Sequence, residues 1–522
     1  MLTNQKDFKL AMKLSNQGRF NEAKTSMLGI HEKYQACFDF YYYLGAIYFH
    51  LHDWANAVKF LYLSIPFREL SPLPYHLLGQ IFIEIGDFSK AILNFHEAAR
   101  LDSASSDIQN DLGCALQKSG RQLEAIACFN SALKLDPSFR DAYNNKGICL
   151  CSLNRYEEAR EEFHKAVKLD PFFFVSHLNH ALSLQMLGRF DEALKSLNQS
   201  IKLNPSSDLN KWNKATLLLL LDQYEEAWPL HESRWKTVLV NNRAFKEPIW
   251  LGDSSIDGKK ILIHAEQGFG DVIQFARYIP QLKSLGAKVT FEVPPELYLL
   301  MQSIDDVKVI HKNEFEGGFD FQCPIVSLPL AFKTNIYNIP SHDYLKNFSH
   351  NRSLIWNKKT PPKNTRLNLG ICWSGSNTLI EHYRRSVDLK ELETLLMLPV
   401  NFHVLQKQIK PEEKIKLDSL GINYYDDMIK DFNDTASLIE HMDLVITIDT
   451  SVAHLASSLN KATWIMIPFV PDWRWGINRI DCPWYPTAKL HRQTIASSWV
   501  EPLNNIIKDL TKLIAARSVL SE

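Results

Sequence analysis

An alanine recurs every 34 residues through the first half of this 522-residue chain. A small residue stands twelve positions before each alanine, and a larger side chain stands four positions after it. A fixed period of this length predicts a solenoid whose units are pairs of antiparallel helices. The small residues let the two helices approach closely, and the larger side chain fills the seam between them. The seven alanines are Ala23, Ala57, Ala91, Ala125, Ala159, Ala193 and Ala227.

The units of this repeat resemble the tetratricopeptide repeat over about residues 4–236, which gives about seven repeats. Proline closes three successive units, at Pro137, Pro171 and Pro205. The first unit departs from the pattern with Met27, and the last departs with His231. Because terminal repeats of a solenoid act as caps, we expect atypical ends.

Asparagines recur in the first helices of these units, which line the concave surface of such a solenoid. A primary amide both donates and accepts, so regularly spaced amides could hold an extended peptide by its backbone. The column resembles the asparagine ladder of the O-linked N-acetylglucosamine transferase superhelix. The alternative is that these are ordinary exposed asparagines, because the first four units carry Lys9, Tyr43, Leu77 and Asp111 there. The candidate acceptor-binding residues are Asn145, Asn179 and Asn213, with Asn110 and Asn144 one position earlier.

The pattern changes to alternating strands and helices after Trp250. An apolar run over 260–264 predicts a buried strand, and a glycine-containing loop, a helix over 272–285 and a strand over 288–293 follow. Such a unit predicts a parallel sheet. Two further strands are expected near 307–310 and 319–328. The polar stretch 347–364, with two adjacent prolines, is predicted to be a linker between domains.

The same alternation restarts beyond the linker. Strands are predicted over 367–373, 402–406, 444–448 and 463–467, and helices over 389–398, 411–420, 435–441 and 452–459. We therefore predict an α-solenoid followed by two Rossmann-like α/β domains, over 250–350 and 365–515, that face a cleft. Ligands of such sheets bind at the carboxyl ends of the strands.

One turn between a predicted strand and a predicted helix has the residues of an anion-binding site. The strand over 444–448 delivers Asp449, and Thr450 and Ser451 then open a helix. Free backbone N–H groups and the helix dipole favour an anion such as a diphosphate at this point. His454 lies one helical turn further along. The alternative is that Asp449 or Thr450 simply caps the helix.

This segment is similar to the DTGxxH signature of the ADP-heptose lipopolysaccharide heptosyltransferases, which have the GT-B fold. The region from Trp250 to Trp499 resembles the branch of that superfamily that is joined to tetratricopeptide repeats. The other matching stretches are HAEQGFGDVIQFARYIPQL, CWSGSN, VLQK and PFVPDWRWGINRIDCPWYP. The resemblance implies an inverting glycosyltransferase that moves a sugar from a nucleotide-diphospho-sugar by direct displacement.

The resemblance also implies roles for individual residues. Asp271 falls where the family has its proposed catalytic base, although it could equally cap the helix over 272–285. Lys407, and Arg385 or its neighbour Arg384, would neutralise the leaving diphosphate, or these arginines are solvated loop cations. The implied donor site comprises Asp449, Thr450, Ser451 and His454, with Ser374, Gly375 and Asn377 lining the cleft.

Two departures from the family bear on these roles. The second signature position is usually glycine and here is Ser451, which keeps its N–H but narrows the space for a phosphate. No DxD motif stands at a strand end, so we expect no metal and no cofactor beyond the nucleotide-sugar co-substrate. The acceptor is expected to be a protein or peptide recruited by the repeats. The alternative is a non-catalytic adaptor whose second half is a degenerate nucleotide-binding scaffold.

The charge balance excludes other partners. Lys and Arg total 58 against 59 for Asp and Glu, which disfavours a nucleic-acid groove and an anionic membrane surface. The eight cysteines form no CxxC pair, and no apolar run is long enough to span a membrane. These features favour a cytoplasmic protein with reduced cysteines. His177 and His180 have helical spacing but no third ligand, and an aromatic stretch over 469–486 either packs the core or stacks on a ligand.

Overall fold

The computed structural model describes residues 6–31, 37–237, 243, 245–266, 268–314, 317–340, 344–345, 350–360, 366–375 and 382–521. The chain forms two compact units, Met1–Pro205 and Ser206–Glu522, which we name the repeat unit and the α/β unit. The repeat unit is entirely helical in its described residues, whereas the α/β unit contains two parallel sheets.

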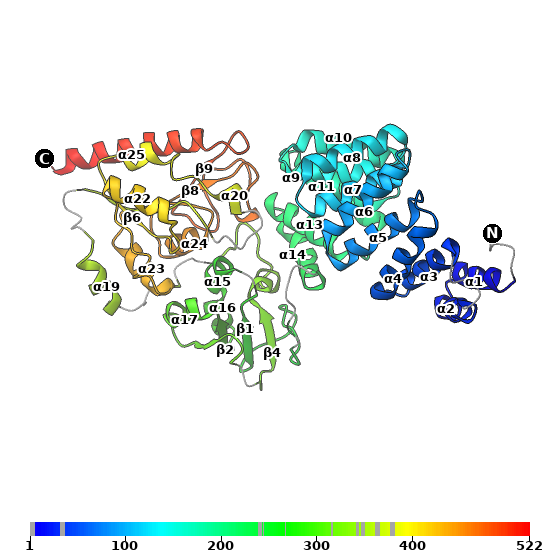
Figure 1. The fold of residues 1–522 in the computed structure, drawn as a ribbon. Coiled ribbons are helices and arrows are strands. Elements are labelled where there is room, and N and C mark those ends of the chain that lie inside the picture. The colour runs from blue at the N-terminus through cyan, green and yellow to red at the C-terminus, as the bar shows by residue number, and fades with distance from the viewer. Residues whose placement is uncertain are drawn as a thin grey trace. The chain divides into compact units, whose positions relative to one another are not determined.

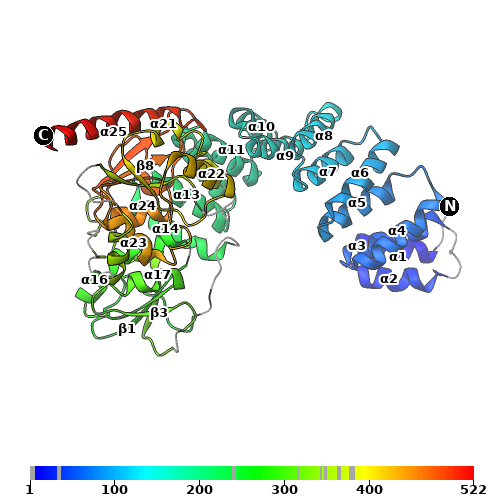
Figure 2. The same cartoon turned by 60° about the vertical axis from the view of Figure 1, so that its left-hand side comes forward.

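The repeat unit consists of six successive pairs of antiparallel helices in the residues described (Figures 1 and 2). Each helix packs on the next, and from the second pair to the sixth the first helices of neighbouring pairs also contact one another. The helices are α1 (Lys6–Asn16), α2 (Phe20–Gly29), α3 (Phe38–His50), α4 (Trp54–Ser64), α5 (Leu73–Ile85), α6 (Phe88–Leu101), α7 (Ser106–Lys118), α8 (Gln122–Leu135), α9 (Arg140–Ser152), α10 (Tyr156–Leu169), α11 (Phe174–Met186) and α12 (Phe190–Leu203), with a short η3 (Ile65–Phe67) after α4.

The seam inside each pair has the construction expected from the repeat. The six alanines of the 34-residue series in this unit are fully buried. A β-carbon added at Gly113 would lie 2.6 Å from the Phe129 ring, and one at Gly147 would lie 2.6 Å from the Phe163 ring. Because no carbon atoms approach that closely, only glycine lets the second helix lie at this distance. The interpretation of the small and bulky positions is confirmed.

We expect Gly113→Ala to destabilise the repeat unit by about 1–3 kcal/mol, because the added methyl overpacks the seam against Phe129. The matched control is Gly29→Ala at the end of α2, where a β-carbon meets nothing within 4 Å. That change should be neutral or stabilise by up to about 1 kcal/mol, because alanine favours helix. Thermal unfolding followed by circular dichroism at 222 nm compares the two. Equal effects would contradict the seam model.

The asparagine column forms hydrogen bonds between successive first helices. The amide nitrogen of Asn145 donates to Asn110 Oδ1 at 3.1 Å, and that of Asn179 donates to Asn144 Oδ1 at 3.0 Å. Asn110 and Asn144 are buried, so they join helices and do not face a bound peptide. Only Asn145 and Asn179 of these four are partly exposed. Asn213 instead donates to Leu209 O of its own helix, at 2.9 Å.

A similar polar contact joins α5 and α7, where Asp111 interrupts the asparagine series. Asp111 Oδ2 lies 2.8 Å from His76 Nε2 and accepts from the Gln80 amide at 3.0 Å. Asp111 and His76 are 35 residues apart, as are the two asparagine pairs. A polar contact between residues 35 apart therefore joins the first helices of three consecutive neighbouring pairs, α5 to α7, α7 to α9 and α9 to α11.

The α/β unit begins with one more helix pair and a short turn. These elements are α13 (Asp208–Leu220), α14 (Tyr224–His231) and η4 (Glu232–Lys236). Trp228 of α14 donates from its indole to Thr334 O at 2.9 Å, and its ring lies 5.5 Å from the Trp473 ring. Asp222 pairs with Arg479 at 3.5 Å. The pair that completes the repeat pattern is thus packed into the fold of the second unit.

The first lobe of the α/β unit is a four-stranded parallel sheet in the order β3-β2-β1-β4. The strands are β1 (Lys260–His264), β2 (Lys288–Val293), β3 (Lys308–His311) and β4 (Phe321–Pro324). Ile263 of the central strand pairs with Phe291 on one side and Cys323 on the other. The helical elements are α15 (Phe269–Phe275), η5 (Ala276–Tyr278), α16 (Ile279–Ser284), α17 (Pro295–Met301), η6 (Ile325–Ser327) and α18 (Leu328–Ala331).

The second lobe is a five-stranded parallel sheet in the order β6-β5-β7-β8-β9. Every residue of the central β7 is buried, which is typical of a strand with both faces covered. The strands are β5 (Asn368–Cys372), β6 (Asn401–Val404), β7 (Leu444–Ile448), β8 (Thr463–Ile467) and β9 (Ala488–Arg492). The helices are α19 (His350–Asn357), α20 (His382–Arg385), α21 (Glu393–Leu396), α22 (Pro411–Leu420), α23 (Phe432–Glu440), α24 (Ser451–Ser458), η7 (Trp473–Trp475) and α25 (Val500–Ser521).

The observed bounds differ from the prediction more for the helices than for the strands. The helix expected over 272–285 is broken into α15, η5 and α16, because Pro280 cannot continue the hydrogen-bond ladder of the preceding turns. The helix expected over 389–398 is only α21, and helix α19 lies inside the stretch predicted to be a linker. Strand β9 was not predicted. The α/β class is confirmed for this region.

Candidate functional site

Two helices, one from each lobe, meet at the carboxyl ends of their central strands. Helix α15 follows β1, helix α24 follows β7, and the two helices pack together. Gly270 lies directly on His454, since a β-carbon at Gly270 would come within 2.7 Å of the imidazole Cδ2. The residues predicted for acid–base chemistry and for anion binding therefore share one place in the fold.

The first turn of α24 has unused hydrogen-bond donors. Thr450 is the N-cap residue, but its side chain makes no capping hydrogen bond. No described residue accepts a hydrogen bond from the backbone N–H of Ser451 or Val452. Thr450 and Ser451 are partly exposed, whereas Asp449 is 5% exposed and its carboxylate lies 3.4 Å from Arg385 Nη1. The alternative that Thr450 caps the helix by its side chain is wrong, and the helix start can accept an anion.

Asp271 lies in the first turn of α15, and its side chain is 13% exposed. Its Oδ2 accepts the backbone N–H of Gly268 at 3.0 Å, so the helix-capping role is present. Its Oδ1 accepts from Arg474, which comes from η7 of the other lobe. Capping therefore accounts for only one carboxylate oxygen, and the second is held by a charge from across the lobe boundary.

Arg474 is the centre of a partly buried cluster of charges. Its guanidinium donates to Gln274 Oε1 at 2.6 Å, to Asp472 Oδ1 at 2.8 Å and to Asp271. Burial raises the pKa of Asp271 and of Asp449, and the positive charge of Arg474 opposes both shifts. Burial acts the same way on Asp472, but Arg474 outweighs it and lowers the pKa of that carboxyl. Arg474 thus favours the ionised form of the three carboxylates.

His454 is held as a neutral ring at the same junction. Its Nδ1 lies 2.9 Å from the Tyr485 hydroxyl, and its ring stacks on Trp475 with centroids 5.3 Å apart. Burial, and then the nearby Arg474, lower the pKa of His454 to about 3. The imidazole is therefore uncharged near neutral pH and positions the helix start by packing.

We expect the stability of the α/β unit to fall on acidification because of His454. The unfolded histidine binds a proton below about pH 6.5, whereas the folded one does so only near pH 3. The unfolded state binds more protons between these values, so stability drops as pH falls through this window. This group alone should cost about 2 kcal/mol between pH 7 and pH 5. Urea unfolding at both pH values should show His454→Gln losing that much less than wild type. An identical pH dependence in the two proteins would contradict this.

The glycine loop after β5 lies against the same helix start. A β-carbon at Gly375 would lie 3.3 Å from Thr450 Cγ2, and the backbone N–H of Ser374 donates to Gln406 Oε1 at 3.2 Å. Arg385 is the member of the predicted arginine pair that contacts Asp449. Asn377, which was also predicted to line the cleft, lies outside the described residues.

Lys407 follows Gln406, which accepts from the predicted cleft residue Ser374, but its own side chain bonds elsewhere. Its side chain is exposed, and its ammonium donates to the carbonyl oxygen of Lys430 at 3.1 Å. No described contact joins it to Asp449 or Thr450. The loop after β6 directs this side chain toward Lys430, which precedes α23, and its contact with a diphosphate stays a prediction.

The sequence interpretation missed Arg474, Asp472 and Gln274 as members of the cluster. The signal was present, because an Asp and an Arg interrupt the aromatic stretch at 472 and 474. A charged pair inside a buried aromatic segment needs partners, and those partners lie about 200 residues earlier. The aromatic side chains themselves pack the core, since Trp473, Trp475, Trp484 and Tyr485 are buried.

Two family models of the tetratricopeptide repeat match this chain. One matches residues 110–172, and the other matches residues 74–105 and 175–207. These segments are tetratricopeptide repeats. They overlap helices α5 to α12, so the predicted repeat solenoid is confirmed for this part of the chain.

Comparison with individual proteins finds distant relatives. FlbA of Caulobacter vibrioides is 24% identical over 290 residues, which are 50% of this chain and 48% of FlbA. The chain thus spans about half the length of this relative. Among solved structures, MamA is 21% identical, with a TM-score of 0.31 and coverage of 32% of this chain and 92% of MamA. YrrB, described as a tetratricopeptide-repeat protein with an unusual peptide-binding site, is 19% identical, with a TM-score of 0.32 and coverage of 36% and 97%. The pilF protein of Pseudomonas aeruginosa is 18% identical, with a TM-score of 0.34 and coverage of 37% and 88%.

The described residues contain neither a membrane-spanning helix nor a cluster of metal ligands. Within the described residues, no helix combines the length and apolar character needed to cross a bilayer. The same residues contain no group of three His, Cys, Asp or Glu side chains placed to hold a metal ion. His177 contacts Pro171 O at 3.0 Å, and His180 contacts Ser196 Oγ at 3.1 Å.

Proposed function

We propose that this chain is a glycosyltransferase of the GT-B type that moves a sugar from a nucleotide-diphospho-sugar to a protein or peptide. The observation that supports it most is that α15, which carries Asp271, packs against α24 with its open start, so that Gly270 lies on His454. A base and an anion site must be close together for displacement at an anomeric carbon. Two lobes supply them here from the ends of their central strands.

Each participant has a distinct task in the proposed reaction. The donor diphosphate binds the free N–H groups of Ser451 and Val452, with Arg385 near Asp449 adding positive charge. Asp271 takes the proton from the acceptor hydroxyl or amine as that group attacks the anomeric carbon. The bond from that carbon to the diphosphate breaks as the new bond forms, so the configuration inverts. No metal is required in this scheme.

Arg474 favours the ionised form of Asp271, which a general base needs. A general base must be ionised, and the guanidinium favours that form of a carboxyl whose pKa burial raises. The same contact uses one lone pair of Oδ1, so a second lone pair remains to receive the proton of the acceptor. A diphosphate at the start of α24 would offer the guanidinium an alternative anion.

The repeat unit is proposed to recruit the acceptor. Asn145 and Asn179 are partly exposed on the first helices. Each donates an N–H to an asparagine of the preceding first helix, and its own amide oxygen remains an acceptor. An extended peptide could donate its backbone N–H groups to these oxygens. The repeats then raise the local concentration of the acceptor near the base.

Mass spectrometry tests the proposed function directly. The full-length protein is incubated with mixed nucleotide sugars and a cell lysate, and the proteins are then searched for added sugar masses. We expect a defined mass increment on one or a few proteins, with nucleoside diphosphate released in equal amount. No increment with any donor would contradict the proposal.

A non-catalytic scaffold is the second candidate, and one observation favours it. Both oxygens of Asp271 are engaged, one by Gly268 and one by Arg474, as in a purely structural carboxylate. In that case the α/β unit supports the repeats and binds no donor. A thermal-shift panel of nucleoside diphosphates separates the two, because a scaffold would show no shift with any member.

A further inference from the structure

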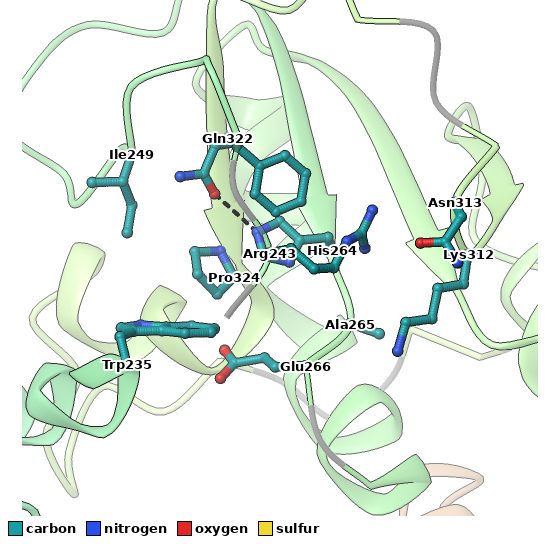
Figure 3. A pocket seen from close by; sticks show the side chains of 11 residues that line it. Trp235, Arg243, Ile249, His264, Ala265, Glu266, Lys312, Asn313, Gln322 and Pro324 are labelled. Carbon is teal, nitrogen blue, oxygen red and sulfur yellow. Dashed lines mark hydrogen bonds between the residues drawn. The ribbon is translucent and has the colours of Figure 1, made fainter. Parts of the chain in front are cut away.

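A cavity of about 450 Å³ opens at the carboxyl edge of the first lobe (Figure 3). Its walls come from the ends of β1, β3 and β4 and from the segment that precedes β1. The volume is within the range of sites that hold small molecules. The carboxyl edge of a parallel sheet is also where such proteins bind their ligands.

A fixed aromatic ring forms one wall of this cavity. The guanidinium of Arg234 lies over the Trp235 indole, 4.5 Å from the ring centroid, and the indole N–H donates to Glu232 at 3.3 Å. The ring is therefore held on one face and at its polar edge, and it borders the cavity (Figure 3). A rigid indole face is a good surface for the C–H face of a sugar ring, which has both apolar and polar sides.

Two polar groups are available beside this ring. The Glu266 side chain is 1% exposed, and its Oε2 accepts only from Arg234 among the described residues, at 2.9 Å, which leaves a lone pair free. Gln322 Oε1 lies 2.9 Å from His264 Nε2, while its amide nitrogen turns toward Ile249 (Figure 3). The cavity thus offers one acceptor and one donor. A hydroxyl group can donate to the first and accept from the second.

The charges around the cavity favour a neutral ligand. A cation is disfavoured, because the Arg234 guanidinium already lies over the Trp235 ring and Lys312 lines the cavity. An anion is disfavoured beside Glu266, because its carboxylate is part of the cavity wall. Arg243 also lines the cavity, but a glutamate of β2 already pairs with it. A ring with an apolar face and uncharged hydroxyls satisfies all of these conditions.

We propose that this cavity binds a neutral saccharide unit, with its ring on Trp235 and its hydroxyls on Glu266 and Gln322. The site does not depend on the transfer reaction proposed above, because binding here requires neither Asp271 nor a diphosphate. The saccharide is a separate sugar, such as one already carried by the acceptor.

Saturation-transfer-difference NMR on the full-length protein tests this site. The probes are methyl glycosides of neutral hexoses and N-acetylhexosamines, with glucosamine and glucuronate as charged comparators. We expect at least one neutral glycoside to bind without nucleotide, and to bind at least about 10-fold more tightly than either charged sugar. Ile249→Trp fills the cavity from a position that is 38% exposed, and it should weaken binding by about 10-fold or more.

Two variants control for misfolding and for non-specific binding. Trp235→Leu should weaken saccharide binding as Ile249→Trp does, and Trp464→Leu, at a partly buried tryptophan of β8 in the other lobe, should leave it unchanged. Loss of the signal in the Trp464 variant, or its survival in both cavity variants, would overturn the proposal. Preference for a charged sugar would overturn it as well. Binding that requires added nucleoside diphosphate would identify the donor's sugar site and overturn an independent saccharide site.

Discussion

Asp271→Asn is expected to reduce kcat/KM for sugar transfer by about 10²- to 10⁴-fold, the usual contribution of a general base. The amide cannot take a proton from the acceptor, but its oxygen can still accept the Gly268 N–H that caps α15. The fold and the affinity for nucleoside diphosphate should therefore be retained. The measurement is initial-rate kinetics with the donor and acceptor identified by mass spectrometry, accompanied by a thermal melt and a nucleotide titration.

A matched control separates base catalysis from capping. Asp434 also lies in the first turn of a helix, α23, where it accepts the Lys430 N–H at 2.8 Å and pairs with Arg352 at 2.9 Å. Asp434→Asn removes the same charge from the same local setting, so it should leave kcat/KM within about 2-fold of wild type. Full turnover by Asp271→Asn would remove the proposed base. Equal losses in both variants would assign Asp271 a structural role only.

Arg234→Met is expected to destabilise the α/β unit by about 3–5 kcal/mol, the cost of leaving buried charges without their partner. Arg234 is fully buried and holds the 1%-exposed Glu266 through two hydrogen bonds of 2.9 Å. It also donates to Glu232 at 2.6 Å and to Ser327 at 2.8 Å. Methionine fills similar space but neutralises neither glutamate. Burial already raises the pKa of Glu266, and losing Arg234 would raise it further.

Denaturant unfolding measures this effect in the full-length chain. Every tryptophan except Trp54 lies in the α/β unit, so tryptophan fluorescence follows that unit. Lys416→Met provides the control, because its ion pair with Glu393 is 2.6 Å long but has both side chains more than a third exposed. That change should cost less than about 1 kcal/mol. A loss below about 1 kcal/mol in Arg234→Met would show that the turn after α14 is not anchored by this network.

The elements that could be predicted from the sequence are those whose pattern is local. Strand β7 is a continuous apolar run with β-branched residues, and its bounds at 444–448 agree with the prediction. The 34-residue period likewise placed the glycines that face phenylalanine rings. Each of these signals depends only on the nearest residues or on one repeat.

Features that depend on how distant segments meet could not be predicted in this way. The hydrogen bond between Arg474 and Asp271 joins residues 203 positions apart, and no local sequence pattern predicts it. The bonds between residues 35 apart in the solenoid follow the stacking of helices, not the 34-residue period of the sequence. Lys407 was assigned from its place in a motif, and the turn that directs it to Lys430 carries no such signal.

A calorimetric titration of nucleoside diphosphates into wild type and Ser451→Asp tests most directly whether the start of α24 binds a diphosphate. Ser451 is the first residue of α24, where a carboxylate stabilises a helix but repels a bound anion, so the variant should fold and bind poorly. We expect wild type to bind at least one nucleoside diphosphate and the variant to bind it about 100-fold or more weakly. Binding of equal strength in both proteins, or no binding by wild type, would contradict a diphosphate site at the start of α24.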